Sequence, residues 1–411
     1  MTKKKTPAPR SLASFSKTAL PYLGGLTPER FMRHYWQKVP LVVRGAFPSW
    51  QLPAKASRPI DKNDVFALSS DERLTSRFVN ASYEVRHGPF RRRQLPSLNS
   101  PGWTVLVQQT NTVWPQAEEF LDHFRFVPNC RLDDLMVSLA SDQGGIGAHV
   151  DSYDVFLIQA YGCRRWEVAT VFQPDLKDNL DLKILKRFKP EASYDMRPGD
   201  LLYLPPGVAH RGTAQGTNCI TYSVGFRAAN RLEIADESFM AHLNELSDNP
   251  WRDPWLEATD KPSHVPARLL KTMTDQVMEC LPTRQQVEDK VLASLSEPVD
   301  SVYFSPPGPH AKTLARFKAC LQKGGEIQLS LGSRILIAGQ RVAVNGEIIR
   351  LSTLPVRLQV KASEIFETLA QRRKISLNYC GAAVSSPAIL EIFYRMYLDG
   401  FIVFLEKNKR S

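Results

Sequence analysis

Short apolar and β-branched runs, separated by glycine and proline, dominate residues 77 to 226 and predict a segment built from strands. The runs are Phe78–Val79, Tyr83–Val85, Trp103–Val107, Val155–Ile158, Trp166–Val168, Leu201–Leu204 and Ile220–Val224. Many short strands joined by turns favour a double-sheet jelly roll or a cupin-like barrel. Before this segment, Thr27-Pro28-Glu29 is typical of a helix start, and Leu41–Val43 predicts a further strand.

Helical spacing replaces the strand pattern after Asn230. Phe239, Leu243 and Leu246 recur at helical intervals, and a second helical stretch runs from about residue 266 to residue 295. An apolar stripe that follows a completed barrel needs something to cover it. We therefore expect residues 231–296 to form a homodimer interface, the alternative being that the stripe packs on its own core.

Strands and helices are mixed in the last third of the chain. Apolar runs between residues 327 and 349 and at 401–404 predict strands, and residues 362–372 and 387–398 have helical spacing. Ser386 and Pro387 supply a plausible cap and first turn for the last helix. Residues 301–411 are therefore expected to form a separate α+β domain.

Length and composition fit a multidomain globular protein. A chain of 411 residues suggests two or three domains, and its 43% hydrophobic and 23% charged residues are ordinary globular values. No apolar run approaches the roughly 20 residues that span a bilayer, so we expect a cytoplasmic protein without a membrane anchor. Residues 1–22 are basic and lack the apolar segment of a signal peptide, which predicts a disordered tail.

The net charge of +11 is concentrated near the C-terminus. Residues 301–411 hold 16 basic and 7 acidic residues. This surplus is compatible with a nucleic-acid partner such as ribosomal RNA, although a charged run is more often a solvated face.

Two separated motifs offer ligands for one metal ion. His149 and Asp151 are two residues apart, so on a strand their side chains point to one face. His210 follows the rigid corner Pro205-Pro206-Gly207 after an apolar strand, and a rolled β-fold can bring it beside the first motif. Two imidazoles and one carboxylate leave positions open, as in non-haem Fe(II) oxygenases, whereas structural zinc takes four protein ligands. The alternative is that His149 and His210 are unrelated loop residues.

An oxygenase that uses 2-oxoglutarate also needs a cation for the distal carboxylate of that co-substrate. Arg164 and Arg165 precede Trp166 and lie on opposite faces of a predicted strand, so only one of them can face the pocket.

Together these motifs closely resemble the Jumonji C ribosomal oxygenases. The resemblance is strongest to the bacterial arginine hydroxylases that act on large-subunit ribosomal protein sixteen. It covers roughly the first 230 residues and rests on residues 149–166, 198–200 and 205–210, with further matches at 87–90, 133–136, 153–156 and 222–227.

The resemblance implies an architecture and a reaction. The fold class is α+β: a double-stranded β-helix oxygenase domain at 23–230, a helical dimerisation region at 231–300 and a winged-helix-like domain at 301–411. The implied enzyme binds Fe(II) through His149, Asp151 and His210 and anchors 2-oxoglutarate through Arg164. It uses O2 to hydroxylate a protein side chain and releases succinate and carbon dioxide.

The substrate implied by the resemblance is an arginine of a large-subunit ribosomal protein. Tyr153 and Asp154 follow the metal strand and are candidates to hold a guanidinium, although Tyr153 could simply pack and Asp154 could cap a turn. Three alternatives stay open: a Jumonji C hydroxylase of another residue, a cupin isomerase, and an inactive module that binds nucleic acid or the ribosome.

Overall fold

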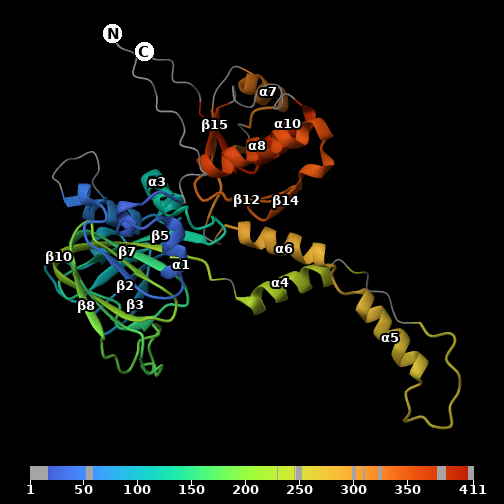
Figure 1. Cartoon of the computed structure of the whole chain (residues 1–411), viewed down its shortest axis with the longest axis horizontal. Coiled ribbons are helices and arrows are strands. Elements are labelled where there is room, and N and C mark those ends of the chain that lie inside the picture. The colour runs from blue at the N-terminus through green and yellow to red at the C-terminus, as the bar shows by residue number, and fades with distance from the viewer. Residues whose placement is uncertain are drawn as a thin grey trace. The chain divides into compact units, whose positions relative to one another are not determined.

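A computed structural model of the chain describes residues 17–51, 59–228, 230–244, 246, 252–298, 302–308, 311–322, 326–376 and 386–405. The chain divides into two compact units (Figure 1): Met1–Ala228 with Val299–Tyr303, and Ala229–Pro298 with Phe304–Ser411. Of the expected tail at 1–22, residues 1–16 lie outside the described residues. Tyr22 is buried in the core of the first unit, so ordered structure begins before residue 23.

An antiparallel sheet of ten strands forms the first unit, and Figure 1 shows it rolled around a core. Along the sheet the order is β1-β9-β7-β10-β5-β4-β2-β3, with β6 paired to β10 and β8 paired to β7. The strands are β1 (Leu41–Val43), β2 (Ser76–Val79), β3 (Val85–His87), β4 (Thr104–Val107), β5 (Leu132–Ala140), β6 (His149–Val150), β7 (Val155–Ala169), β8 (Ala192–Met196), β9 (Leu201–Leu204) and β10 (Ala209–Phe226). The expected rolled β-fold is confirmed.

Three helices accompany the sheet: α1 (Pro28–His34), α2 (Lys62–Ser69) and α3 (Pro115–Leu121). The start of α1 is as predicted, because the Thr27 side chain accepts a hydrogen bond from the Arg30 N–H at 3.2 Å. Phe31 is fully buried and packs its ring against Phe156 and Tyr203 of the sheet. Burying a large aromatic side chain contributes about 2–3 kcal/mol, so this contact fixes the helix on the sheet.

Three features of the sheet differ from the sequence pattern. The runs at 155–158 and 166–168 belong to one long strand, β7, because Gly162 with φ +67° turns the chain without ending the pairing. Strand β5 was not predicted, since Asp133, Asp134 and Ser138 interrupt its apolar residues. Tyr83 lies in a turn with φ +64°, so the predicted run there begins only at Val85.

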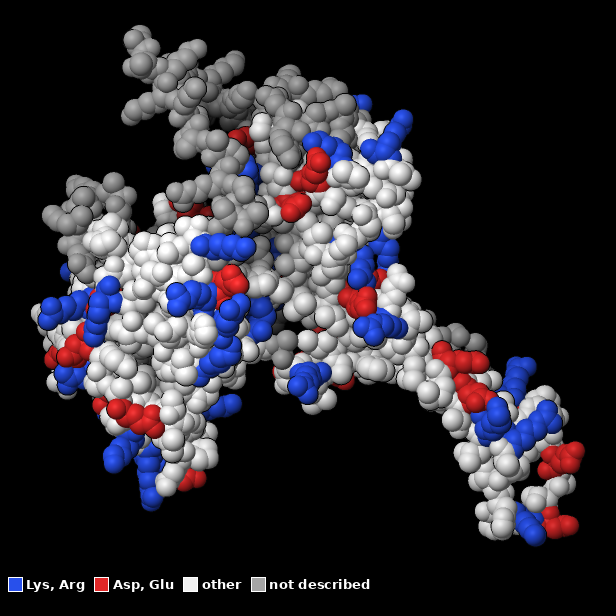
Figure 2. Space-filling model, in the orientation of Figure 1, with Lys and Arg blue, Asp and Glu red and all other residues white. Residues whose placement is uncertain are grey.

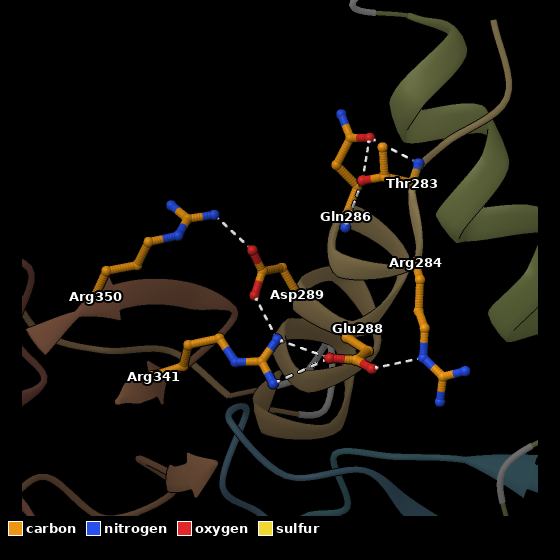
Figure 3. Close-up of polar contacts among 7 residues, drawn as sticks. All are labelled: Thr283, Arg284, Gln286, Glu288, Asp289, Arg341 and Arg350. Carbon is orange, nitrogen blue, oxygen red and sulfur yellow. Dashed lines mark hydrogen bonds and ion pairs between the residues drawn. The ribbon is translucent and has the colours of Figure 1, made fainter. Parts of the chain in front are cut away.

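Three helices open the second unit: α4 (Arg231–Leu243), α5 (Ala267–Glu279) and α6 (Arg284–Ser296). The helical stretch expected at 266–295 therefore consists of two helices. Pro282 separates them, because proline has no N–H to donate and favours an extended residue before it. Thr283 and Gln286 then form a capping box that starts α6 (Figure 3).

Helices and small sheets complete the second unit. Its sheets have the orders β15-β11-β16 and β12-β13-β14, and its core includes Phe317, Ile365, Phe366 and Phe393. The elements are α7 (Leu314–Gln322), β11 (Glu326–Leu329), β12 (Ile335–Ala338), β13 (Arg341–Val344), β14 (Glu347–Arg350), α8 (Val356–Arg372), β15 (Lys374–Ser376), α10 (Pro387–Leu398) and β16 (Ile402–Leu405). Ser386 occupies the cap position of α10 but its side chain makes no capping hydrogen bond.

The winged-helix-like character of residues 301–411 stays a prediction. Within the described residues, every helix is too short or too polar to cross a lipid bilayer.

Candidate metal centre and its pocket

Strand pairing brings the two predicted ligand motifs together. Strand β10 pairs with the short β6, and His210 lies opposite His149 in the register. The imidazole ring centroids are 4.2 Å apart. Asp151 follows β6, with its carboxylate oxygens 3.8 Å from His149 Nε2 and 3.6 Å from His210 Nε2. One ligand atom from each residue lies within 4.8 Å of the others, so a single ion can contact all three.

Backbone carbonyls orient both imidazoles toward this point. His149 Nδ1 lies 3.1 Å from the Gly147 carbonyl, and His210 Nδ1 lies 3.0 Å from the Val208 carbonyl. A carbonyl only accepts, so each Nδ1 carries the proton and each Nε2 presents a lone pair toward Asp151. Such outer hydrogen bonds fix the ring and tautomer of metal-binding histidines.

Burial sets the protonation of the centre. Desolvation, with a smaller contribution from His149, lowers the pKa of His210 to about 3, so its imidazole is neutral at neutral pH. Desolvation also raises the pKa of Asp151, against the opposing effects of His149 and of a hydrogen bond from Tyr153. A cation in the centre would favour both the neutral imidazole and the ionised carboxylate.

Arg164 and Arg165 are separated by the two faces of β7, as expected. Arg164 is only 4% exposed and lines the same pocket as the three ligands. Its guanidinium lies 5.6 Å from the Trp166 ring centroid and makes a long, 3.5 Å contact with the Gly212 carbonyl. Arg165 points outward and forms two hydrogen bonds with Asp195, at 2.8 and 3.0 Å.

The pocket contains buried hydrogen-bond donors that have no partner in the described part of the protein, and an anionic ligand could accept from them. Among the described residues that line the pocket, Arg164 Nε and Nη2, Arg77 Nε and the Thr104 hydroxyl are buried without a hydrogen-bond partner. Leaving a buried donor unsatisfied costs about 1–3 kcal/mol, more when it is charged. A carboxylate beside Arg164 would accept from the guanidinium, so the site fits 2-oxoglutarate as well as a metal.

The pocket has a volume of about 340 Å³, large enough for a small co-substrate and one side chain. Asp134 and Met136 of β5 form part of its wall. Ile184, from the loop between β7 and β8, also lines it. That loop is tied to the metal strand because the Leu185 N–H donates to the Ala148 carbonyl at 2.8 Å.

The two candidate substrate residues have different places. Tyr153 lines the pocket and hydrogen-bonds Asp151. Asp154 does not line it: its carboxylate is fully buried, accepts from the Tyr203 hydroxyl at 2.6 Å and from Gln37 Nε2 at 3.0 Å, and lies 3.7 Å from Arg131. These donors occupy the carboxylate inside the fold, so Asp154 is not placed to contact a ligand in this pocket.

Several pocket residues were not identified from the sequence. Thr104 and Ile184 carry no motif and reach the pocket only through the rolled sheet and the β7–β8 loop. Asp133 and Asp134 belong to a motif of the family resemblance, but their position on β5 was not foreseen.

Known proteins with similar sequences are oxygenases. Residues 119–234 match the JmjC domain family. The chain is 29% identical over 383 residues to the ribosomal protein uL16 3-hydroxylase of Escherichia coli K12, covering 91% of this chain and 96% of that protein. It is 35% identical over 223 residues to a probable ribosomal oxygenase of Haemophilus influenzae, covering 51% and 52% of the two chains.

Solved structures agree along nearly the whole chain. The ribosomal oxygenase YcfD of Escherichia coli, in complex with cobalt and 2-oxoglutarate, aligns with a TM-score of 0.75 and 28% identity over 93% of this chain and 99% of that one. Another crystal structure of YcfD gives a TM-score of 0.78 over 92% and 98%.

Proposed function

Because the chain carries a JmjC domain and is similar to ribosomal oxygenases over most of its length, we propose that it is an Fe(II)- and 2-oxoglutarate-dependent protein hydroxylase. The observation that carries the proposal is one pocket that holds His149, Asp151 and His210 together with the unpartnered donors of Arg164. A cupin isomerase would need the metal ligands but no buried, unpartnered arginine.

His149, Asp151 and His210 are proposed to hold the iron, and Arg164 is proposed to hold the distal carboxylate of 2-oxoglutarate. When bound there with O2, the iron and 2-oxoglutarate would supply the hydroxylation of a C–H bond, with 2-oxoglutarate converted to succinate and carbon dioxide. The protein positions both partners: carbonyls hold the imidazoles, and Trp166 supports one face of the Arg164 guanidinium. Buried walls limit the access of water to the reacting centre.

An arginine of a large-subunit ribosomal protein is the proposed substrate residue, with protein sixteen the first candidate. The similarity to a uL16 hydroxylase supports the ribosomal protein. The pocket wall supports the arginine, because Asp134 and Tyr153 both line it. A guanidinium in a pocket needs an acidic partner, and Asp134 fits that role better than Asp154 because it lines the pocket, with its Oδ2 also accepting from the Gln109 N–H at 2.7 Å. Such a substrate would be met in the cytoplasm.

A homodimer through residues 231–296 is part of the proposal. Helix α5 buries none of its residues within the described chain, and Leu270, Met273, Val277 and Met278 are exposed on it. Apolar side chains at these intervals form a stripe that a second copy could cover.

Contact of residues 301–411 with ribosomal RNA is a weaker part of the proposal, because some of their basic side chains are paired with acids. Figure 3 shows why: the acids of α6 pair with arginines of β13 and β14. Asp289 binds Arg341 and Arg350 at 3.0 and 2.5 Å, and Glu288 also binds Arg341. Basic and acidic side chains alternate over the drawn face of this unit as well (Figure 2). Paired cations attract a polyanion weakly.

Succinate formation tests the proposed reaction. Purified protein with Fe(II), 2-oxoglutarate and a ribosomal protein substrate should release succinate. Asp151→Ala should lower the rate at least about a hundredfold, because replacing a residue that only hydrogen-bonds a metal ligand already lowers metal affinity or activity about 10- to 100-fold. Full activity of Asp151→Ala would reject the metal assignment. No succinate from the wild-type protein would favour an inactive binding module.

A further inference from the structure

Four arginines lie close together in a segment that the proposed reaction does not use. Arg86, Arg91, Arg92 and Arg93, here called the arginine edge, are all exposed, and residues 86–93 contain no acid. Arg86 lies on β3, the last strand in the sheet order, and the other three lie in or beside the 3₁₀ turn Arg92–Gln94.

Aromatic rings and carbonyls, not acids, support these guanidinium groups. Arg86 lies 4.3 Å from the Phe78 ring centroid and donates to the Gln94 carbonyl at 3.2 Å. Arg92 lies 4.3 Å from the Phe66 ring centroid and donates to the Leu95 carbonyl at 2.9 Å. Within the described chain, none of the four forms an ion pair with Asp or Glu, in contrast to Arg341 and Arg350. Their positive charge is therefore not neutralised locally.

Two of the nearby acids have partners of their own. Glu84, just before β3, accepts from Asn80 Nδ2 at 2.6 Å, and Asp71 binds Arg73 through both carboxylate oxygens. The neutral amide leaves the charge of Glu84 in place, and the four cations of the arginine edge outnumber it.

Strand β3 connects the arginine edge with the wall of the metal pocket. His87 of β3 lies opposite Arg77 of β2, which lines the pocket, whereas Arg86 lies opposite Phe78 on the other face of these strands. The arginine edge therefore lies within one strand of the pocket wall, on the opposite face of the sheet.

We propose that the arginine edge binds the phosphate backbone of RNA that accompanies the substrate, an inference that rests on the proposed ribosomal substrate. Arginine presents five N–H donors in a planar fork that matches phosphate oxygens, and all four cations are arginine. Phe66 and Phe78 are covered by the guanidinium groups, so the surface recognises the backbone without stacking bases, and its binding depends little on sequence.

An RNA partner fits the chemistry better than an acidic protein does. Ribosomal proteins lie against RNA and are themselves rich in cations, so an unpaired cationic surface on this unit would weaken the binding of a bare ribosomal peptide without preventing it. The phosphates of an RNA that contacts both proteins would neutralise both surfaces. The enzyme would then bind its substrate protein more tightly when RNA accompanies it.

Fluorescence anisotropy with a labelled 20-nucleotide uridine homopolymer tests the proposal, using full-length protein without iron or 2-oxoglutarate. The test variant is Arg91→Gln with Arg93→Gln, since neither side chain has a described hydrogen bond that the fold would lose. Each phosphate contact on a single strand contributes roughly 0.7 to the slope of log K against log salt. The double variant should bind about tenfold more weakly at 0.1 M salt, with the slope smaller by about 1.4.

The matched control is Arg357→Gln with Lys374→Gln, two exposed cations of the second unit. This control changes the charge equally and should keep wild-type binding. The proposal is overturned if the wild-type protein does not bind, if the control loses as much affinity as the test variant, or if a labelled polyglutamate peptide binds as tightly as the RNA. Asp151→Ala should bind RNA like the wild type, so a failed oxygenase assay and a failed RNA assay are separate results.

Discussion

Two adjacent arginines give the sharpest contrast at the scale of single residues. Arg164 is buried with unpartnered donors, whereas Arg165 is exposed and paired with Asp195. A hydrogen bond to a charged group contributes about 1.5–3 kcal/mol, so Arg164→Ala should raise the KM for 2-oxoglutarate roughly 10- to 100-fold. Arg165→Ala should change it less than about twofold, since an exposed pair contributes little.

Steady-state succinate formation at varied 2-oxoglutarate measures both KM values. Arg164→Lys should recover part of the loss, because an ammonium keeps the charge without the planar fork. If Arg165→Ala had the larger effect, the co-substrate would lie on the other face of β7.

Asp154 is expected to stabilise the fold and not to select substrate. Asp154→Ala would leave the buried Tyr203 hydroxyl and the Gln37 side chain without their acceptor, lowering the free energy of unfolding by about 2–3 kcal/mol. Chemical denaturation measures this loss. Asp151→Ala in metal-free protein is the matched control and should change stability much less, because its partner Tyr153 is 38% exposed and can turn to water. Equal losses would contradict this division of roles.

The sequence predicted the residues whose chemistry is local and missed those that depend on the rolled sheet. The spacing of His149 and Asp151 places both on one side of a strand, and alternation along β7 separates Arg164 from Arg165. Thr104 and Ile184 join the pocket through contacts distant in sequence, which no local pattern records. Asp154 was a candidate for a substrate contact or for a turn cap, and no local pattern decides between such roles because its partners Gln37 and Tyr203 are distant in sequence.

Among the elements, strands were predicted where they are apolar on both faces and missed where polar residues alternate. β9 is fully buried and was evident, whereas β8, with the sequence ASYDM, has three exposed or half-buried polar positions and was not. In the helical region, Pro282 divides the predicted stretch into α5 and α6.

Helix α5 carries a prediction about assembly. Leu270 and Val277 are 60% and 65% exposed on a helix that buries none of its residues within the described chain. If this stripe is a dimer interface, Leu270→Gln with Val277→Gln should halve the mass measured by light scattering at micromolar concentration, because buried apolar area drives association.

Val356→Gln with Val360→Gln provides the matched control on α8, where both valines are also highly exposed. That variant should keep the wild-type mass. A wild-type mass of one chain would show that the α5 stripe is not a dimer interface under these conditions.

At the scale of the whole molecule, charge is distributed differently from what the C-terminal surplus suggested. The second unit uses Arg341 and Arg350 to hold α6 against β13 and β14, while the first unit leaves the arginine edge unpaired. Net charge counted along the chain does not distinguish paired from unpaired cations, since pairing depends on which elements meet.

The most direct test of the account measures oxygen transfer and succinate in the same reaction. Purified protein with Fe(II), 2-oxoglutarate and O2 would be given three peptides from a large-subunit ribosomal protein, with the candidate arginine kept, changed to lysine or changed to alanine. We expect the arginine peptide alone to gain one oxygen by mass spectrometry, with one succinate formed for each. Equal oxygen gain in all three peptides would exclude arginine as the target, and oxygen gain without succinate would contradict the proposed reaction itself.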